Sequence, residues 1–233
     1  MKKLPTLFQR VFDENHNKSI TRKVTPGCEW VMHGVGTPTL KFDGACCAII
    51  DEEIYRRYDA KQKYGKVPPE GAIPCQPEPD PITGHWPHWV KCVEGNPMDK
   101  YFLEAYRISK ARVLSDIGDR VADRGYPIKK GEAFTCEAMG LHWQGNPYRF
   151  PFDFLMLHGK VTVSWDALAD GFGNITFESI RQYVTTEWEL PDWAKETPGF
   201  HLQGAIEGLV FWKDGEPRCK IKRSDFGSKW PRI

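Results

Sequence analysis

The chain has 233 residues, 40% of them hydrophobic, and a formal net charge of +1. This length accommodates one large domain or two small ones, and the composition allows a true hydrophobic core. The small net charge excludes a polycation that holds nucleic acid through its total charge, so any nucleic-acid contact requires a local basic face. No shift in composition marks a boundary, and we expect a single domain over residues 1–233.

The seven cysteines predict free thiols and not a disulfide framework. Their number is odd, Cys46 and Cys47 are adjacent, and no two cysteines form a C-x-x-C pair. This usage is typical of a reducing compartment. Only short apolar fragments follow the basic start at Met1, so the sequence predicts neither a secretory segment nor a membrane span. We therefore expect a cytoplasmic protein without a membrane partner.

The stretch Lys41-Phe42-Asp43-Gly44 is the first candidate site. A short strand over 29–32 is expected to lead toward it. Side chains two apart on an extended chain share a face, which would place Lys41 beside Asp43. Gly44 lets a backbone or a ligand approach closely. Lys41 could then be a nucleophile, although the same four residues also fit an ordinary turn.

Two apolar runs, 45–50 and 54–58, predict a hairpin that returns an arginine toward the lysine. A three-residue turn would pair Cys47 with Arg57, on the face of Asp43 and Lys41. A turn of two or four residues would place Arg56 on that face.

The segment 66–89 is rich in proline and glycine and predicts a long irregular excursion. In and just after it lie four residues of zinc-ligand type, Cys75, His85, His88 and Cys92. Their spacing matches no common zinc pattern, so they are either scattered loop residues or an unusual metal site.

Asn96 and Pro97 predict the start of a helix, since asparagine suits the N-cap and proline the first helical position. Its apolar stripe extends to Val121, and Gly125 can end it. We expect this helix to be scaffold.

Three further elements follow. The run 131–140 predicts a strand in which Glu137 is embedded among apolar residues, and a buried carboxylate needs a partner. The run 150–157 predicts a central strand. The run 177–185 predicts a helix with Thr176 as its cap.

Asp214-Gly215 between two apolar runs predicts a hairpin. A regular ladder would pair Phe211 with Arg218, Leu209 with Lys220, and Glu207 with Lys222. One face would then carry Glu207, Lys220 and Lys222. The opposite face would carry Val210, Trp212, Cys219 and Ile221. The three charged residues could form a site or merely exposed ion pairs across the strands, which contribute little stability.

Together these residues suit nucleotidyl transfer through a covalent lysine. An ordinary lysine is almost fully protonated at pH 7, and nearby cations such as Lys220 and Lys222 favour its neutral, nucleophilic form. The same cations would offset charge on a reacting phosphate. Glu207 suits Mg²⁺, and an aromatic side chain from 150–154 could stack on a base.

These motifs resemble, in order, those of covalent nucleotidyltransferases, the superfamily of ATP-dependent DNA and RNA ligases and GTP-dependent mRNA capping enzymes. The segments that carry the resemblance are Lys41–Gly44, Phe134–Gly140, Phe152–Phe154, Glu207–Phe211 and Lys220–Lys222. Further segments are similar to the small RNA ligases that include the vertebrate cytosolic 5′-3′ RNA ligase: Lys41–Cys47, Gly145–Tyr148, Asp225–Gly227 and Trp230–Pro231.

The resemblance implies an α+β nucleotidyltransferase domain of antiparallel sheets flanked by helices, with ATP between the sheets and no OB-fold domain. It implies that ATP adenylylates Lys41, that Lys220 and Lys222 hold the α-phosphate, and that Glu207 binds Mg²⁺, with Mn²⁺ as an alternative. Asp43 would hold the ribose or phosphate side of the site.

The same resemblance assigns nucleotide contacts elsewhere in the chain. Glu137 would bond the ribose, Arg57 would contact ribose or the RNA 5′ end, and Phe152 would stack on adenine, with Phe150 and Phe154 as alternates. Thr39-Leu40 precedes the lysine where many ligases carry a glutamate, so Thr39 or its backbone would have to contact the adenine edge.

The implied reaction seals an RNA 5′-phosphate to a 3′-hydroxyl, with RNA ends as partners and no obligate protein partner. One alternative is the core of a DNA ligase or of a capping-type guanylyltransferase. The chain ends soon after Lys222 without an OB-fold domain, which weighs against both. Another alternative is a catalytically silent module that binds RNA ends.

Overall fold

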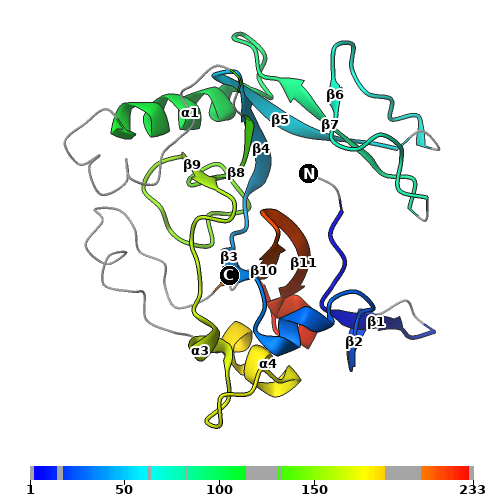
Figure 1. Ribbon diagram of the computed structural model, residues 1–233. Coiled ribbons are helices and arrows are strands. Elements are labelled where there is room, and N and C mark those ends of the chain that lie inside the picture. Colours follow the sequence, from blue (N-terminus) through cyan, green and yellow to red (C-terminus); the bar gives the residue numbers. More distant parts are fainter. Residues whose placement is uncertain are drawn as a thin grey trace. The chain divides into compact units, whose positions relative to one another are not determined.

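The structure is a computed structural model, and it describes residues 3–14, 18–61, 64–81, 83–113, 131, 133–186 and 206–230 (Figure 1). The chain forms two compact units. The first comprises 43–158 with the first three residues, and the second comprises 4–42 and 159–233. Antiparallel sheets with a few helices make the fold α+β, as predicted. A single nucleotidyltransferase domain over 1–233 stays a prediction.

The first unit is built on a six-stranded antiparallel sheet (Figure 1). In sheet order its strands are β6 (Ile73–Pro74), β7 (Trp86–Lys91), β5 (Glu53–Ala60), β4 (Ala45–Ile50), β8 (Ala133–Met139) and β9 (Phe154–Leu157). Helix α1 (Lys100–Val113) covers one face, where Phe102 packs with Cys47, Cys136 and Leu155. Because side chains alternate along a strand, Cys46 and Glu137 point to the opposite face.

The hairpin of β4 and β5 has a two-residue turn, not the three-residue turn that would select Arg57. Ile50 pairs with Glu53, and both turn residues, Asp51 and Glu52, have positive φ. This left-handed pair matches the twist of the flanking strands. Cys47 therefore pairs with Arg56, and Arg57 lies on the other face with Cys46 and Glu137.

Two predicted boundaries in this unit are wrong. Helix α1 begins at Lys100 and not at Pro97; a turn precedes it, in which the Asp99 amide donates to the Asn96 carbonyl at 3.0 Å. Val121 and Gly125 lie outside the described residues. The predicted central strand is an edge strand that begins only at Phe154.

The shortened strand β9 has a local cause. The Asn146 side-chain amide bonds both the amide and the carbonyl of Phe150, at 2.9 and 2.8 Å, so this backbone is committed to a loop. Asp153 is buried and accepts from the amide of His142 and contacts its ring, which ties the start of the strand to the preceding loop.

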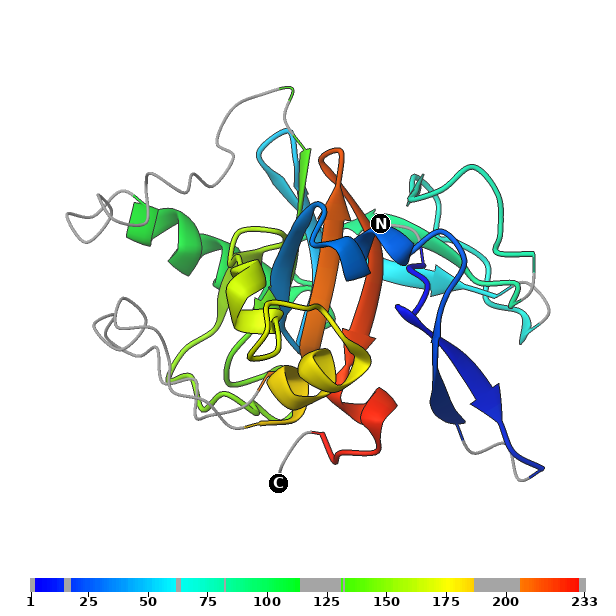
Figure 2. The same cartoon turned by 60° about the horizontal axis from the view of Figure 1, so that its bottom comes forward.

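Within its described residues the second unit contains two antiparallel sheets and four short helices, whose arrangement is seen in Figure 2. One sheet pairs β1 (Phe8–Phe12) with β2 (Lys18–Val24), and the other has the order β11 (Glu216–Lys222), β10 (Gly208–Lys213), β3 (Thr37–Lys41). The helices are η1 (Glu29–His33), α3 (Trp165–Leu168), α4 (Phe177–Thr185) and η4 (Arg223–Phe226). The predicted strand over 29–32 is wrong, because this segment forms η1, which Gly34 ends in the left-handed conformation.

The core of this unit lies on one face of the three-stranded sheet. Its sheet residues are Leu209, Phe211, Cys219 and Ile221, all fully buried. Leu168 of α3 and Ile180 and Val184 of α4 join them in the same cluster. The opposite face of the sheet carries Thr39, Lys41, Gly208, Val210, Lys220 and Lys222.

Additional backbone pairs protect both edges of this sheet. Along β11 the Leu7 amide donates to the Lys220 carbonyl at 2.8 Å, and the Lys220 amide donates to the Pro5 carbonyl at 3.0 Å. Along β3 the Leu40 amide donates to the Val161 carbonyl at 2.9 Å. Open strand edges invite pairing with other chains, and these segments satisfy that potential internally.

A β-bulge corrects the predicted pairing of β10 with β11. The two-residue turn pairs Lys213 with Glu216, as a regular hairpin would, but the register shifts by one residue beyond Trp212. Phe211 pairs with Cys219, so Arg218 is the extra residue. A regular ladder would have paired Phe211 with Arg218 on the buried face, where an unpaired guanidinium is costly.

The bulge changes which residues share a face. Val210 pairs with Lys220, and Gly208 pairs with Lys222, whereas the regular ladder had paired Glu207 with Lys222. Val210 therefore lies on the lysine face. The prediction that it shares a face with Cys219 is wrong.

No helix within the described residues is long and apolar enough to cross a membrane.

Helix α4 has the predicted bounds and the predicted cap. The Thr176 hydroxyl accepts from the Ser179 amide at 3.0 Å, and the Ser179 hydroxyl accepts from the Thr176 amide at 2.9 Å. This reciprocal capping box satisfies two amides that the first helical turn leaves unpaired.

Replacing Thr176 by alanine is expected to lower the free energy of unfolding by about 1 kcal/mol, because one capping acceptor is lost. Thr176→Ser keeps the hydroxyl and serves as the matched control, with little expected change. Urea titrations followed by circular dichroism measure both. Equal stability of the two variants would contradict the structural role of the cap.

Candidate functional site

Lys41, Gly208 and Lys222 form one row across the three strands of the second unit. Gly208 of the central strand β10 pairs with Lys41 on β3 and with Lys222 on β11. The neighbouring row on the same face consists of Thr39, Val210 and Lys220. Segments separated by more than 160 residues in the sequence thus bring three lysines onto one sheet face.

Glu207 links two of these lysines through its carboxylate. The Lys41 Nζ lies 2.5 Å from Glu207 Oε2, and the Lys222 Nζ donates to Glu207 Oε1. The Glu207 side chain is only 3% exposed, whereas the Lys41 side chain is 20% exposed. A carboxylate at this depth requires counter-charges, and the two ammonium groups supply them.

The backbone of Glu207 is fixed from the other side by Arg223. The Arg223 amide donates to the Glu207 carbonyl at 2.7 Å, and its Nε donates to the Ile206 carbonyl at 3.3 Å. A third bond joins the guanidinium to the Thr186 carbonyl at 2.8 Å. The position from which Glu207 reaches the lysines is therefore set by a fully buried arginine.

Lys220 has the most perturbed lysine environment in this cluster. Burial, together with the positive charges of Lys41, Lys222 and Arg10, lowers the pKa of its ammonium to about 8. Glu207 acts in the opposite direction. Lys220 therefore retains its charge at neutral pH and becomes neutral at a lower pH than an ordinary lysine.

Gly208 leaves no room for a side chain in the middle of this row. A Cβ at this position would lie 2.0 Å from the Ile221 carbonyl oxygen and 2.8 Å from the Lys222 Cα. Both contacts are with backbone, which cannot move aside independently. The absence of a side chain lets β10 and β11 approach closely at the point where Lys41 and Lys222 reach Glu207.

Thr39 is buried, and its hydroxyl serves the sheet. It donates to the Val210 carbonyl at 3.2 Å and accepts from the Trp212 indole Nε1 at 3.0 Å. These bonds fix the strands beside Lys220. The predicted contact of Thr39 with an adenine edge stays a prediction.

Lys41 and Asp43 do not share a strand. Strand β3 ends at Lys41 and β4 begins at Ala45, so the rule that residues two apart share a face does not apply. The Asp43 amide donates to the Tyr148 hydroxyl at 2.8 Å within the first unit. Gly44 is packed closely there, because a Cβ would lie 2.2 Å from the Ala138 carbonyl oxygen.

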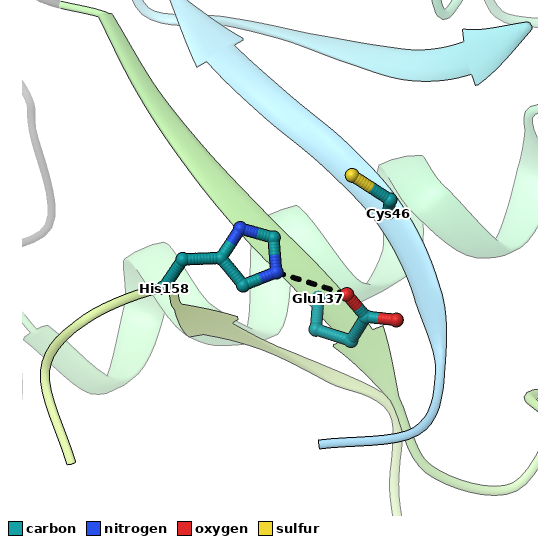
Figure 3. Close-up of side chains that lie close together, drawn as sticks. All are labelled: Cys46, Glu137 and His158. Atoms are coloured by element: carbon teal, nitrogen blue, oxygen red, sulfur yellow. Dashed lines mark hydrogen bonds and ion pairs between the residues drawn. The ribbon is translucent and has the colours of Figure 1, made fainter. Parts of the chain in front are cut away.

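The first unit gathers a second polar group around Glu137. Glu137 Oε2 lies 2.9 Å from His158 Nε2 (Figure 3). On the other side of the ring, His158 Nδ1 lies 2.9 Å from Thr135 Oγ1. Cys46 is the cross-strand partner of Glu137. Burial and the charge of Glu137 raise the pKa of the Cys46 thiol to about 12, and the charge of Arg57 acts against them.

Two other residues with a predicted role belong to this unit. Arg57 contacts Asp59 through both Nε, at 3.0 Å, and Nη2, at 2.9 Å. Phe152 is half-buried, and its ring centroid lies 5.9 Å from that of Phe154 in an edge-to-face arrangement. The roles in nucleotide binding that the resemblance assigns to Arg57, Glu137 and Phe152 stay predictions.

Sequence reasoning missed His158 and Cys46 as neighbours of Glu137. His158 follows an apolar strand directly, and a histidine at a strand end was the available signal. The four predicted zinc-ligand candidates do not form a metal-binding group within the described part of the chain, where the group of three that the structure brings together is Cys46, Glu137 and His158. His88, for example, bonds the Trp86 carbonyl through Nδ1 at 2.8 Å.

Comparison with known proteins adds no assignment. No protein-family model matches the chain, and no curated protein matches it significantly.

The lysine cluster of the second unit, defined as Lys41, Glu207, Lys220 and Lys222, carries more positive than negative charge. Two amines contact one carboxylate, Lys220 adds a third positive charge on the same sheet face, and Arg10 adds to the field at Lys220. Such an excess attracts phosphate groups, and the carboxylate can also hold a cation that accompanies them. The cluster thus combines primary amines, an excess of positive charge and one carboxylate.

Replacing Gly208 by alanine is expected to lower the free energy of unfolding by about 1 to 3 kcal/mol, because the new methyl group overpacks the β10–β11 contact. Gly171→Ala is the matched control, since a Cβ at Gly171 has no atom within 4 Å and little change is expected. Chemical denaturation measures both variants. Wild-type stability of Gly208→Ala would contradict the close approach of the strands.

The pKa of Lys220 is expected to respond to its neighbours with opposite signs. Lys41→Met removes a positive charge and should raise this pKa, whereas Glu207→Gln removes a negative charge and should lower it. Nuclear magnetic resonance of isotopically labelled lysine side chains follows each titration, with Lys160→Met as the control outside the cluster. An ordinary pKa near 10.5 in the wild type, or shifts of reversed sign, would contradict the described environment.

Proposed function

We propose that the protein is an ATP-dependent RNA ligase that acts through a lysyl-AMP intermediate. The observation that carries this proposal is the contact of Lys41 Nζ with Glu207 Oε2 at 2.5 Å, with Lys222 on the other carboxylate oxygen. A lysine that only solvates the surface does not require contact with a buried carboxylate or two further lysines on the same sheet face. The cluster supports a lysine that reacts at a phosphate.

In the first step, the Lys41 amine attacks the α-phosphorus of ATP. A nitrogen–phosphorus bond forms, the bond from the α-phosphorus to the bridging oxygen breaks, and pyrophosphate leaves with that electron pair. The amine loses its proton to solvent and must be neutral to attack. An ion pair with Glu207 favours the ammonium form, so this contact has to be exchanged before the attack.

Glu207 is the residue of the cluster that would hold Mg²⁺. A carboxylate oxygen suits this ion, which commonly combines one or two carboxylates with substrate phosphates. When bound, the ion supplies positive charge that offsets the charge of the triphosphate. Glu207 would then bind the ion in place of Lys41, and the Lys41 amine would be free of its ion pair and able to react.

Lys220 and Lys222 would stabilise charge on the phosphate. Both lie on the sheet face of Lys41, and Lys220 keeps its proton at neutral pH because its pKa is lowered only to about 8. A positive group that is already in place stabilises developing negative charge without reorganisation. Loss of the Lys220 charge in alkaline solution would therefore reduce the rate.

In the later steps, the oxygen of an RNA 5′-phosphate attacks the α-phosphorus of lysyl-AMP and Lys41 leaves as the amine. A 3′-hydroxyl then attacks the activated 5′-phosphate, which forms the phosphodiester bond and expels AMP. The choice of RNA over DNA rests on the resemblance carried by Gly145–Tyr148 and Asp225–Gly227. Asp43, Arg57, Glu137 and Phe152 would contribute the nucleotide contacts that the same resemblance implies.

Incubation with ATP and Mg²⁺ is expected to increase the intact mass of the protein by one AMP group. Lys41→Ala should abolish this gain, and Glu207→Gln should reduce its rate at least tenfold. The matched control is Lys160→Ala, an exposed lysine of the same unit, which should react like the wild type. A gain that survives Lys41→Ala would exclude this lysine as the nucleophile.

The alternatives are separated by the same assay. A mass gain with GTP but not ATP would identify a capping-type guanylyltransferase, and joining of DNA but not RNA ends would identify a DNA ligase core. Binding of labelled RNA ends without any AMP transfer would identify a silent binding module.

A further inference from the structure

The first unit contains a second group of side chains that could bind a metal ion, and the proposed ligase chemistry does not use them as metal ligands. Cys46 on β4, Glu137 on β8 and His158 directly after β9 bring a thiol, a carboxylate and an imidazole close together (Figure 3). One ligand atom from each lies within 4.8 Å of the others. Around a tetrahedral zinc ion, ligand atoms are roughly 3.5 Å apart, so a pair at the 4.8 Å limit would close by about 1 Å, and Glu137 and His158, now 2.9 Å apart, would open slightly.

The register of the sheet explains why these ligands meet. Cys46 and Glu137 are direct partners across β4 and β8, which puts their side chains on the same face. Glu137 in turn pairs with Met156 on β9, and His158 lies two residues beyond Met156. The backbone of His158 is also tied to β8, because its amide donates to the Thr135 carbonyl at 3.0 Å.

The contacts of His158 are compatible with a cation beside its ring in the tautomer that carries its proton on Nδ1. Nδ1 contacts the Thr135 hydroxyl, and Nε2 faces Glu137 Oε2, each at 2.9 Å. When Nδ1 carries the only proton, the lone pair of Nε2 meets a carboxylate oxygen, and these two acceptors require a proton or a metal ion between them. A metal-bound histidine commonly has its other ring nitrogen held in this way.

Burial and charge at this group are consistent with a bound cation. The side chain of Glu137 is 11% exposed and that of His158 is 18% exposed, so protein groups and not bulk water must satisfy the carboxylate. Arg57 opposes a cation, because its guanidinium also reaches the Cys46 thiol. Its charge is partly offset, however, by two contacts with Asp59.

We propose that Cys46, Glu137 and His158 form a Zn²⁺ site. Sulfur, imidazole nitrogen and carboxylate oxygen together select zinc over Mg²⁺, which prefers oxygen ligands alone. Binding replaces the thiol proton of Cys46, which is released to solvent, by the metal. Three protein ligands leave a fourth tetrahedral position for water or for a substrate group.

This site is independent of the Mg²⁺ that the proposed ligase reaction places on Glu207. Zinc binding would nevertheless affect the ligase reaction if Glu137 bonds the ribose of ATP, because one carboxylate would then bind either zinc or the ribose. Zinc would be an inhibitor that competes with ATP, a relation that Mg²⁺ on Glu207 does not produce.

The test is a titration of the metal-free full chain with Co²⁺, a spectroscopic substitute for zinc. One equivalent should produce a thiolate-to-cobalt absorption band in the near ultraviolet together with the visible bands of a tetrahedral site, and Zn²⁺ should abolish both. Cys46→Ser should remove the near-ultraviolet band, and Glu137→Gln and His158→Ala should weaken binding at least tenfold. Cys75→Ser removes another thiol of the same unit and should leave the spectrum unchanged.

A measurement on the wild-type protein tests the proposal even if the variants fail to fold. One equivalent of Zn²⁺ should slow alkylation of Cys46 at least tenfold, as read by peptide mass spectrometry, without changing the rate at Cys75. Equal alkylation of Cys46 with and without zinc, or a cobalt spectrum that survives Cys46→Ser, would overturn the proposal. Neither readout requires ATP, so failure of lysyl-AMP formation and failure of zinc binding are separate results.

Discussion

The second unit depends on the shared ion pair of Glu207 with Lys41 and Lys222. A carboxylate that is 3% exposed is expensive to bury, and two ammonium groups on neighbouring strands offset the cost. Because Lys41 ends β3 and Lys222 ends β11, the same contact holds the two outer strands to the start of β10. One interaction therefore fixes the sheet and assembles the charged residues.

The ion pair also determines the charge that remains at the surface of this sheet. Glu207 offsets two lysines, and Lys220 in the adjacent row is left where burial, and then the positive charges around it, lower its pKa to about 8. Such an arrangement costs stability in the absence of an anion. Binding of a phosphate, as the proposed function requires, would recover this cost, which is a physical reason for a functional site to contain more lysines than its carboxylate can neutralise.

Much of this could be predicted from local sequence signals, and the failures share one physical cause. Thr176 and the Asp214-Gly215 turn were recognised because caps and turns depend on a few adjacent residues. The bulge at Arg218 and the two-residue turn after Ile50 could not be predicted, since both depend on which face is buried against the rest of the fold. His158 was missed because only the pairing of β8 with β9 brings it to Glu137.

Because of the bulge at Arg218, the number of residues between Glu207 and the lysines of β11 can change by one without moving these side chains. Deleting this one unpaired residue would convert the hairpin into a regular ladder, yet Cys219, Lys220 and Lys222 would keep their present partners and faces. A homologous chain could therefore carry a gap of one position here with the same side chains in the same places. A search for equivalent sites should allow variable spacing at this hairpin and demand identity only at the charged positions.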